Sequence, residues 1–173
     1  MESKARLFGH SVHQSLVAFP VGLLITAVVF DAIALLGGNA ALVLISYRII
    51  GAGLIAAAIA APFGLIDLLA VPRGTRAARI GVLHAVGNVI VLLAFIGSWV
   101  LRWQHDGLPT VLALLLSFAG AALLLVTGWL GGELVSRMGI GVLDGAHPNA
   151  PSSLDRHAPM TVDGVPDHAS VRR

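Results

Sequence analysis

Residues 15–36 read SLVAFPVGLLITAVVFDAIALL, and this stretch decides the fold class. It is apolar apart from a few small polar residues and one charge, Asp31. A helix needs about 20 mostly apolar residues to cross a hydrocarbon core of about 30 Å, so the stretch predicts a membrane-spanning helix. Lys4 and Arg6 precede it as in a signal peptide, but the run is too long and lacks a small-residue cleavage site, so we expect a retained anchor.

Three further apolar stretches follow the first one. Of the 173 residues, 57% are hydrophobic and 12% are charged, whereas soluble domains carry about a quarter charged residues. The predicted spans cover residues 15–36, 49–71, 80–101 and 110–130. The sequence therefore predicts an all-α fold, a four-helix transmembrane bundle over residues 15–142. We expect a polar segment before it (residues 1–14) and a disordered tail after it (residues 143–173), where Pro, Asp, His and Ser replace the apolar residues.

Basic residues are distributed unequally between the two ends of the predicted bundle. Only Arg48 and Arg102 lie at the end opposite the N-terminus. The N-terminal end has six, leaving out the tail: Lys4, Arg6, Arg73, Arg76, Arg79 and Arg137. Cytoplasmic loops retain the excess of positive charge, which predicts a bacterial cytoplasmic (inner) membrane protein with both termini inside. The net charge of +2 is explained by this flanking pattern, so the expected partner is the lipid bilayer and not a nucleic acid.

Most of the polar residues of the apolar region are predicted to lie near one membrane face. A charge at bilayer depth costs roughly 2.5 to 3.5 kcal/mol on insertion scales, so such residues indicate either function or pairing. Asn88 follows one of them, His84, by one helical turn. His10 and His13 share a face if their segment is helical. The predicted group comprises His10, His13, Asp67, His84 and Glu133.

This group admits two cofactor hypotheses. Imidazoles and carboxylates are ligands for a divalent metal ion, and all five residues are candidates for that site. Two imidazoles on facing helices also suit haem b, with His84 and either His13 or His10 as axial ligands. Either cofactor would make the chain a subunit in membrane electron transfer. A pattern of two histidines three residues apart identifies neither one.

The alternative is a structural or partner-binding membrane protein, in which the polar group only fixes the bundle. Asp67 would then pair with Arg73 or Arg76, and Glu133 with Arg137. At the opposite end, Asp31 and Arg48 are expected to form an ion pair. A proton or solute route is less favoured because no inverted repeat is visible. No catalytic motif was found, so the sequence assigns no enzymatic activity.

Several short motifs together resemble the family of bacterial membrane proteins called domain of unknown function 2231. The resemblance covers about residues 7–142. Its motifs are Gly9-His10-Ser11-Val12-His13, Phe19-Pro20-Val21-Gly22-Leu23-Leu24, Asp31, Gly64-Leu65-Ile66-Asp67, Pro72-Arg73-Gly74-Thr75, His84 and Gly128-Trp129-Leu130-Gly131-Gly132-Glu133-Leu134. Ser11 and Gln14 stand where the family usually has proline.

The resemblance implies a four-helix membrane domain of undefined activity. Some relatives are joined to a Rieske-type iron–sulfur domain, which implies a redox partner protein. This chain has no cysteine, so such a cluster would have to belong to another protein. When the polar motifs of the family are matched to this sequence, they imply the same five candidate site residues: His10, His13, Asp67, His84 and Glu133.

The topology can be tested with reporter fusions. We expect green fluorescent protein fused after residue 142 to fluoresce and alkaline phosphatase at the same point to stay inactive, because both termini are predicted inside. A phosphatase inserted in the turn at residues 104–109 provides the control and should be active. An active phosphatase at the C-terminus would contradict the predicted orientation.

Overall fold

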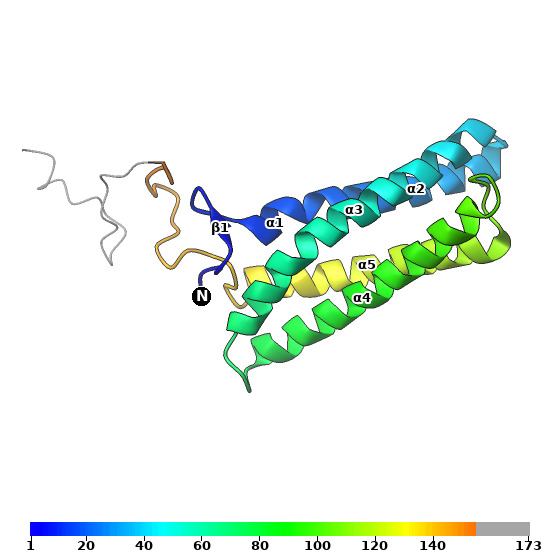
Figure 1. Cartoon of the computed structure of the whole chain (residues 1–173). Helices are drawn as coiled ribbons and strands as arrows, with labels where there is room; N and C mark the ends of the chain where they lie inside the picture. The colour runs from blue at the N-terminus through cyan, green and yellow to red at the C-terminus, as the bar shows by residue number, and fades with distance from the viewer. Residues whose placement is uncertain (155–173) are drawn as a thin grey trace, which may run out of the picture.

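The computed structural model describes residues 1–154, and its main feature is an elongated bundle of four long helices (Figure 1). A five-residue helix, α1 (Val12–Leu16), precedes the first of them. Before it, strands β1 (Arg6–Leu7) and β2 (His10–Ser11) pair antiparallel in a small hairpin. The four long helices are α2 (Ala18–Gly37), α3 (Ala40–Ala70), α4 (Arg76–Trp103) and α5 (Val111–Ser136).

All four long helices are long and apolar enough to span a membrane, as the sequence predicted. Most of them run beyond the predicted spans. For example, α3 begins at Ala40 rather than near residue 49, and α5 ends at Ser136 rather than near residue 130. Pro62 lies inside α3, and the helix continues past it. The outward faces of the helices carry large exposed apolar side chains, which is the composition of a surface in contact with lipid.

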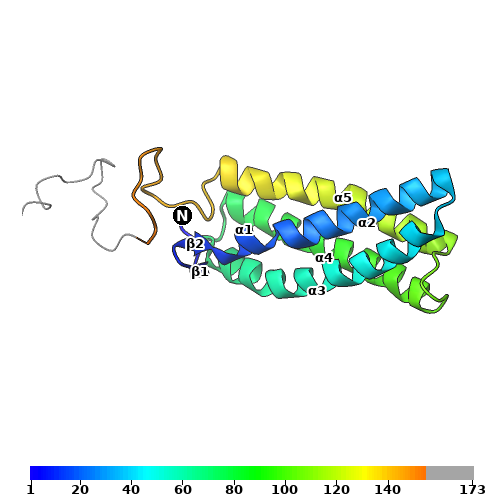
Figure 2. The ribbon, with the colours of Figure 1, turned by 90° about the horizontal axis from the view of Figure 1, so that it is seen from above.

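The helices form two antiparallel hairpins, α2 with α3 and α4 with α5, which lie against each other (Figures 1 and 2). Both hairpins turn at the same end of the bundle, which we call the loop end. At the other end, the terminal end, lie the N-terminus, the connection from α3 to α4 and the segment after α5 (Figure 2). Local sequence sets these turns. Gly38 ends α2 with a φ of 67°, and the side chains of Asn39, Thr75 and Thr110 accept backbone N–H bonds at the starts of the next helices.

The middle of the bundle is packed mainly with apolar side chains. Leu24, Ile50, Val91 and Phe95 are each at most 2% exposed and pack in one cluster. Along the chain, these residues lie between the polar residues of the terminal end and those of the loop end. Ser117 is also buried in this part of the bundle, where its hydroxyl donates to the Leu114 carbonyl of its own helix. The interior therefore has a polar layer near each end and a mainly apolar layer between them.

An ion pair at the loop end joins the two hairpins. Both Nη atoms of Arg102 donate to the Asp31 carboxylate, at 3.1 and 2.6 Å, and both side chains are fully buried. Arg102 Nε donates to Ser98 Oγ at 3.3 Å, and Ser98 in turn donates to the Ala113 carbonyl at 2.7 Å. Such a two-point contact satisfies both charges at once.

The expected pairing of Asp31 with Arg48 was therefore wrong. Arg48 is exposed and lies over the ring of Tyr47, with 5.9 Å between the guanidinium carbon and the ring centroid. Tyr47 stacks on Trp99, which stacks on Trp103. The helix facing Asp31 across the bundle is α4, and for this reason Arg102 reaches the carboxylate.

Replacing Arg102 with Met leaves the Asp31 charge buried without its partner. We expect Arg102→Met to lower the free energy of unfolding by about 3–5 kcal/mol, measured by titration with a denaturing detergent. Arg48→Met is the matched control at the same end of the bundle and should change stability by less than about 1 kcal/mol, since Arg48 is exposed and contacts the Tyr47 ring. Equal losses in the two variants would contradict the assignment.

Candidate functional site

The five polar residues predicted to form one group occupy separate environments at the terminal end. His13 and His84 lie on the interior, each against a neighbouring helix. Asp67 and Glu133 turn to the ends of the helices and to the chain termini, and His10 lies on the exposed β-hairpin. Within residues 1–154, no three His, Asp or Glu side chains are grouped so that they could hold a metal ion.

His84 belongs to a closed hydrogen-bond network between α4 and α5. Its Nδ1 lies 2.8 Å from the Thr127 carbonyl, and its Nε2 lies 3.0 Å from Asn88 Nδ2. Because a carbonyl only accepts, Nδ1 carries the proton and Nε2 accepts from the Asn88 amide. Asn88 Oδ1 then accepts from the Thr127 hydroxyl at 2.9 Å, which closes the ring. Every polar atom of the His84 imidazole is satisfied by this network.

His13 makes the corresponding contact with α3. Its Nδ1 lies 3.1 Å from the Ala60 carbonyl, so Nδ1 again carries the proton. Its ring lies over Gly64, where an added Cβ would come within 2.6 Å of a ring carbon. No hydrogen-bond partner for Nε2 occurs among the residues that the structure describes. His13 and His84 are therefore the two members of the predicted group that bond to a backbone carbonyl of a neighbouring long helix.

His10 does not share a helical face with His13. It lies in β2, is exposed, and its Nδ1 lies 3.0 Å from the carbonyl of Phe8. Gly9, with a φ of 83°, makes the turn that separates the two strands. A common face was predicted only for a helical segment, and that condition is not met, because His10 lies in the β-hairpin and His13 in the short helix after it.

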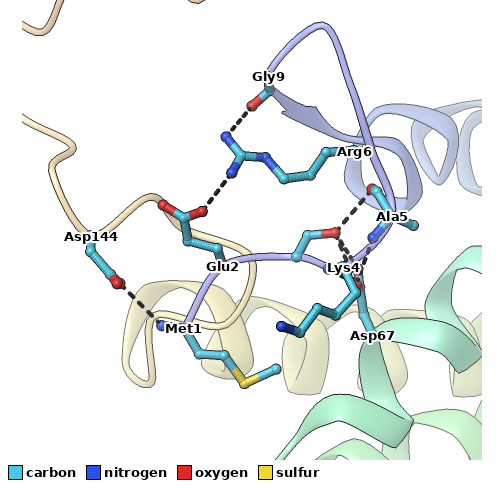
Figure 3. Close-up of polar contacts among 9 residues, drawn as sticks. Met1, Glu2, Lys4, Ala5, Arg6, Gly9, Asp67 and Asp144 are labelled. Atoms are coloured by element: carbon cyan, nitrogen blue, oxygen red, sulfur yellow. Dashed lines mark hydrogen bonds and ion pairs between the residues drawn. The ribbon is translucent and has the colours of Figure 1, made fainter. Parts of the chain in front are cut away.

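Asp67 holds the N-terminal segment against α3 (Figure 3). The Ser3 hydroxyl lies 2.8 Å from both carboxylate oxygens, and the backbone N–H groups of Lys4 and Ala5 donate to Oδ1 at 2.8 and 3.4 Å. A carboxylate that accepts several N–H and O–H bonds is stabilised in its charged form. The expected pairing of Asp67 with Arg73 or Arg76 was wrong because the N-terminus folds back over this residue.

Glu133 of α5 forms ion pairs with two arginines, one at the start of α4 and one directly after α5. One carboxylate oxygen lies 3.2 Å from Arg76 Nη2, which joins α5 to the start of α4. The other lies 3.9 Å from Arg137 Nε, which confirms the pairing predicted from their spacing of four. Both carboxylates of the predicted group are therefore engaged in contacts within the chain.

The N-terminus also contacts the segment after α5, and together they form what we call the terminal cap, residues 1–11 with residues 137–146. The Met1 ammonium donates to the Gly139 carbonyl at 3.2 Å. It also lies 3.6 Å from the Asp144 carboxylate (Figure 3). Gly141 donates its N–H to the Met1 carbonyl at 2.9 Å. Residues 143–154, predicted as part of a disordered tail, form turns in the described structure, whereas 155–173 lie outside the described residues.

The fold and this end of the bundle define a multi-pass membrane protein with four apolar helices and a polar, capped terminal end. The chain belongs to the family of predicted membrane proteins DUF2231, whose model matches residues 9–144. The resemblance seen in the sequence is thereby confirmed. No curated protein and no solved structure matches the chain.

The contact of Asp67 with the N-terminus can be tested by proteolysis. Asp67→Ala removes the acceptor of three donor groups, the Ser3 hydroxyl and the N–H groups of Lys4 and Ala5. We therefore expect trypsin to cleave after Lys4 and Arg6 about tenfold faster, as followed by mass spectrometry. Asp144→Ala is the control, because this exposed carboxylate makes only a 3.6 Å contact with the N-terminus. Equal cleavage rates in both variants would show that Asp67 does not hold the segment.

Proposed function

We propose that the chain is a structural or partner-binding domain of the bacterial cytoplasmic membrane, with both termini inside, whose polar residues fix the bundle and the terminal cap. One observation carries this proposal: the carboxylates of the four long helices all have partners within the chain. Asp31 binds Arg102, Asp67 binds the N-terminal segment and Glu133 binds Arg76. Polar groups that are already satisfied by the fold need no ligand to explain them.

The interior of the bundle also argues against a transport route. A solute or proton path needs polar groups along its length. Here Leu24, Val91 and Phe95 fill the middle of the bundle and are at most 2% exposed, so the two polar layers are separated. This supports a static membrane domain over a transporter.

The terminal cap offers the surface at which a soluble partner would meet the domain. Lys4, Arg73 and Arg79 lie at this end and form no ion pair within residues 1–154, and Arg73 and Arg79 are exposed. An excess of cations favours an acidic protein surface as partner. A Rieske-type redox protein, suggested by the resemblance, would dock here.

A second candidate function, haem binding by His13 and His84, is favoured by one specific observation. Histidines that ligate a metal donate their other ring N–H to a carbonyl or carboxylate, and both rings are held by Nδ1 on a backbone carbonyl. Nε2 of each ring would be the ligand atom. Binding at His84 would first require Asn88 to release Nε2. A divalent metal site that also used Asp67 and Glu133 would have to replace the contacts of Asp67 with the N-terminal segment and the ion pairs of Glu133.

An absorption spectrum of the purified protein, before and after dithionite, separates the two candidates. For a structural domain we expect no Soret band and less than about 0.1 metal ion per chain, because the described carboxylates are already engaged. A Soret band that shifts on reduction, is lost in His84→Ala and persists in His10→Ala would contradict the structural proposal and establish haem. His10→Ala is the control because His10 lies on the exposed hairpin.

A further inference from the structure

The buried residues of the two hairpins correspond position by position. Each buried residue of α3 has a buried counterpart 67 positions later in α5, and four buried residues of α2 have buried counterparts 71 positions later in α4. The α3 and α5 pairs are Ser46 with Ala113, Ile50 with Ser117, Gly53 with Gly120, Ala57 with Leu124 and Ala60 with Thr127. The α2 and α4 pairs are Pro20 with Val91, Leu24 with Phe95, Ala27 with Ser98 and Asp31 with Arg102.

Contacts within each hairpin repeat at the same two offsets. An added Cβ on Gly53 would lie 2.8 Å from the Leu24 side chain, and one on Gly120 would lie 3.0 Å from the Phe95 side chain. In both hairpins a glycine of the second helix therefore receives the large apolar side chain of the first. A shared spacing of buried residues is common in packed helices, but a shared glycine and partner is more specific.

The histidine contacts repeat in the same way. His13 Nδ1 bonds to the Ala60 carbonyl in the first hairpin, and His84 Nδ1 bonds to the Thr127 carbonyl in the second. His84 is 71 positions after His13, and Thr127 is 67 positions after Ala60. The glycines beneath the two rings, Gly64 and Gly131, are also 67 positions apart.

A serine contact near the loop end repeats with its donor and acceptor exchanged. Ser46 Oγ of α3 donates to the Ala27 carbonyl of α2 at 3.0 Å. In the second hairpin, Ser98 Oγ of α4 donates to the Ala113 carbonyl of α5 at 2.7 Å. Ala27 corresponds to Ser98 and Ser46 to Ala113, so the same two positions touch in both hairpins.

Both hairpins run in the same direction along the bundle (Figures 1 and 2), so a rotation of about half a turn around the long axis relates them. Two equivalent residues that touch each other must lie beside that axis. Asp31 and Arg102 are equivalent, 71 positions apart, and they form the buried ion pair. This pair therefore lies where the two hairpins meet around their common axis.

We infer that the domain is a duplicated helix hairpin, and that Asp31 and Arg102 form the complementary pair that joins one hairpin face to the other. If both equivalent positions carried aspartate or both carried arginine, two like charges would be buried beside each other. Placing two like charges side by side costs several kcal/mol, so two hairpins with the same charge at this position would not pair. The α2–α3 hairpin, which carries Asp31, therefore fits the α4–α5 hairpin, which carries Arg102, and not a second copy of itself. This inference stands independently of the proposed function.

Charge exchange in the full chain tests the inference. Asp31→Arg alone and Arg102→Asp alone each bury two like charges, so we expect the melting temperature in detergent to fall by about 6 °C or more. The double variant Asp31→Arg/Arg102→Asp restores opposite charges at equivalent positions and should recover most of the loss. A double variant no more stable than the single variants would overturn the equivalence.

A milder exchange keeps the test informative if the charge variants do not fold. Ser46→Ala removes the serine donor of the first hairpin, and Ala27→Ser places a donor where the second hairpin has Ser98. We expect Ala27→Ser/Ser46→Ala to melt higher than Ser46→Ala. If the added hydroxyl gives no recovery, the two hairpins are not equivalent at this contact and the inference fails.

Discussion

The buried pair of Asp31 and Arg102 is the interaction on which the arrangement of the bundle depends. Each charge alone would cost roughly 2.5 to 3.5 kcal/mol at the depth of a spanning helix. Together they form a two-point hydrogen-bonded contact in which neither side chain is exposed. Since one residue lies on α2 and the other on α4, the contact forms only when the two hairpins meet in one register. In lipid, where no hydrophobic force drives helices together, such polar contacts and close packing decide which faces join.

The terminal end is closed by a different set of contacts. His13 and His84 each bond to a carbonyl of the neighbouring helix, and a glycine makes room for each ring. Asp67 holds the N-terminus, while Glu133 joins α5 to α4. These polar and charged side chains thus connect separate elements of an otherwise apolar chain. Apolar packing alone is not directional and would fix the positions of these elements less precisely.

The spans were predictable because bilayer thickness converts directly into the length of an apolar run. The ion pair of Glu133 with Arg137 was also predictable, since residues four apart meet on any helix. The partner of Asp31 was not, because helices that are apolar on every side give no sign of which face turns inward. Arg48 is on the next span, but Arg102 faces Asp31 across the bundle. Ser3 carries no sequence signal for its contact with Asp67, and the duplication is visible only when buried positions and contacts are compared.

A double-mutant cycle on Asp31→Asn and Arg102→Gln, with unfolding free energies measured in lipid bilayers, tests the central claim most directly. The two side chains bind each other in a buried site, so we predict strong non-additivity, with a coupling energy of about 2 kcal/mol or more. In that case the double variant loses much less stability than the sum of the single variants. Additive losses, within about 0.5 kcal/mol, would contradict the claim that this pair joins the hairpins.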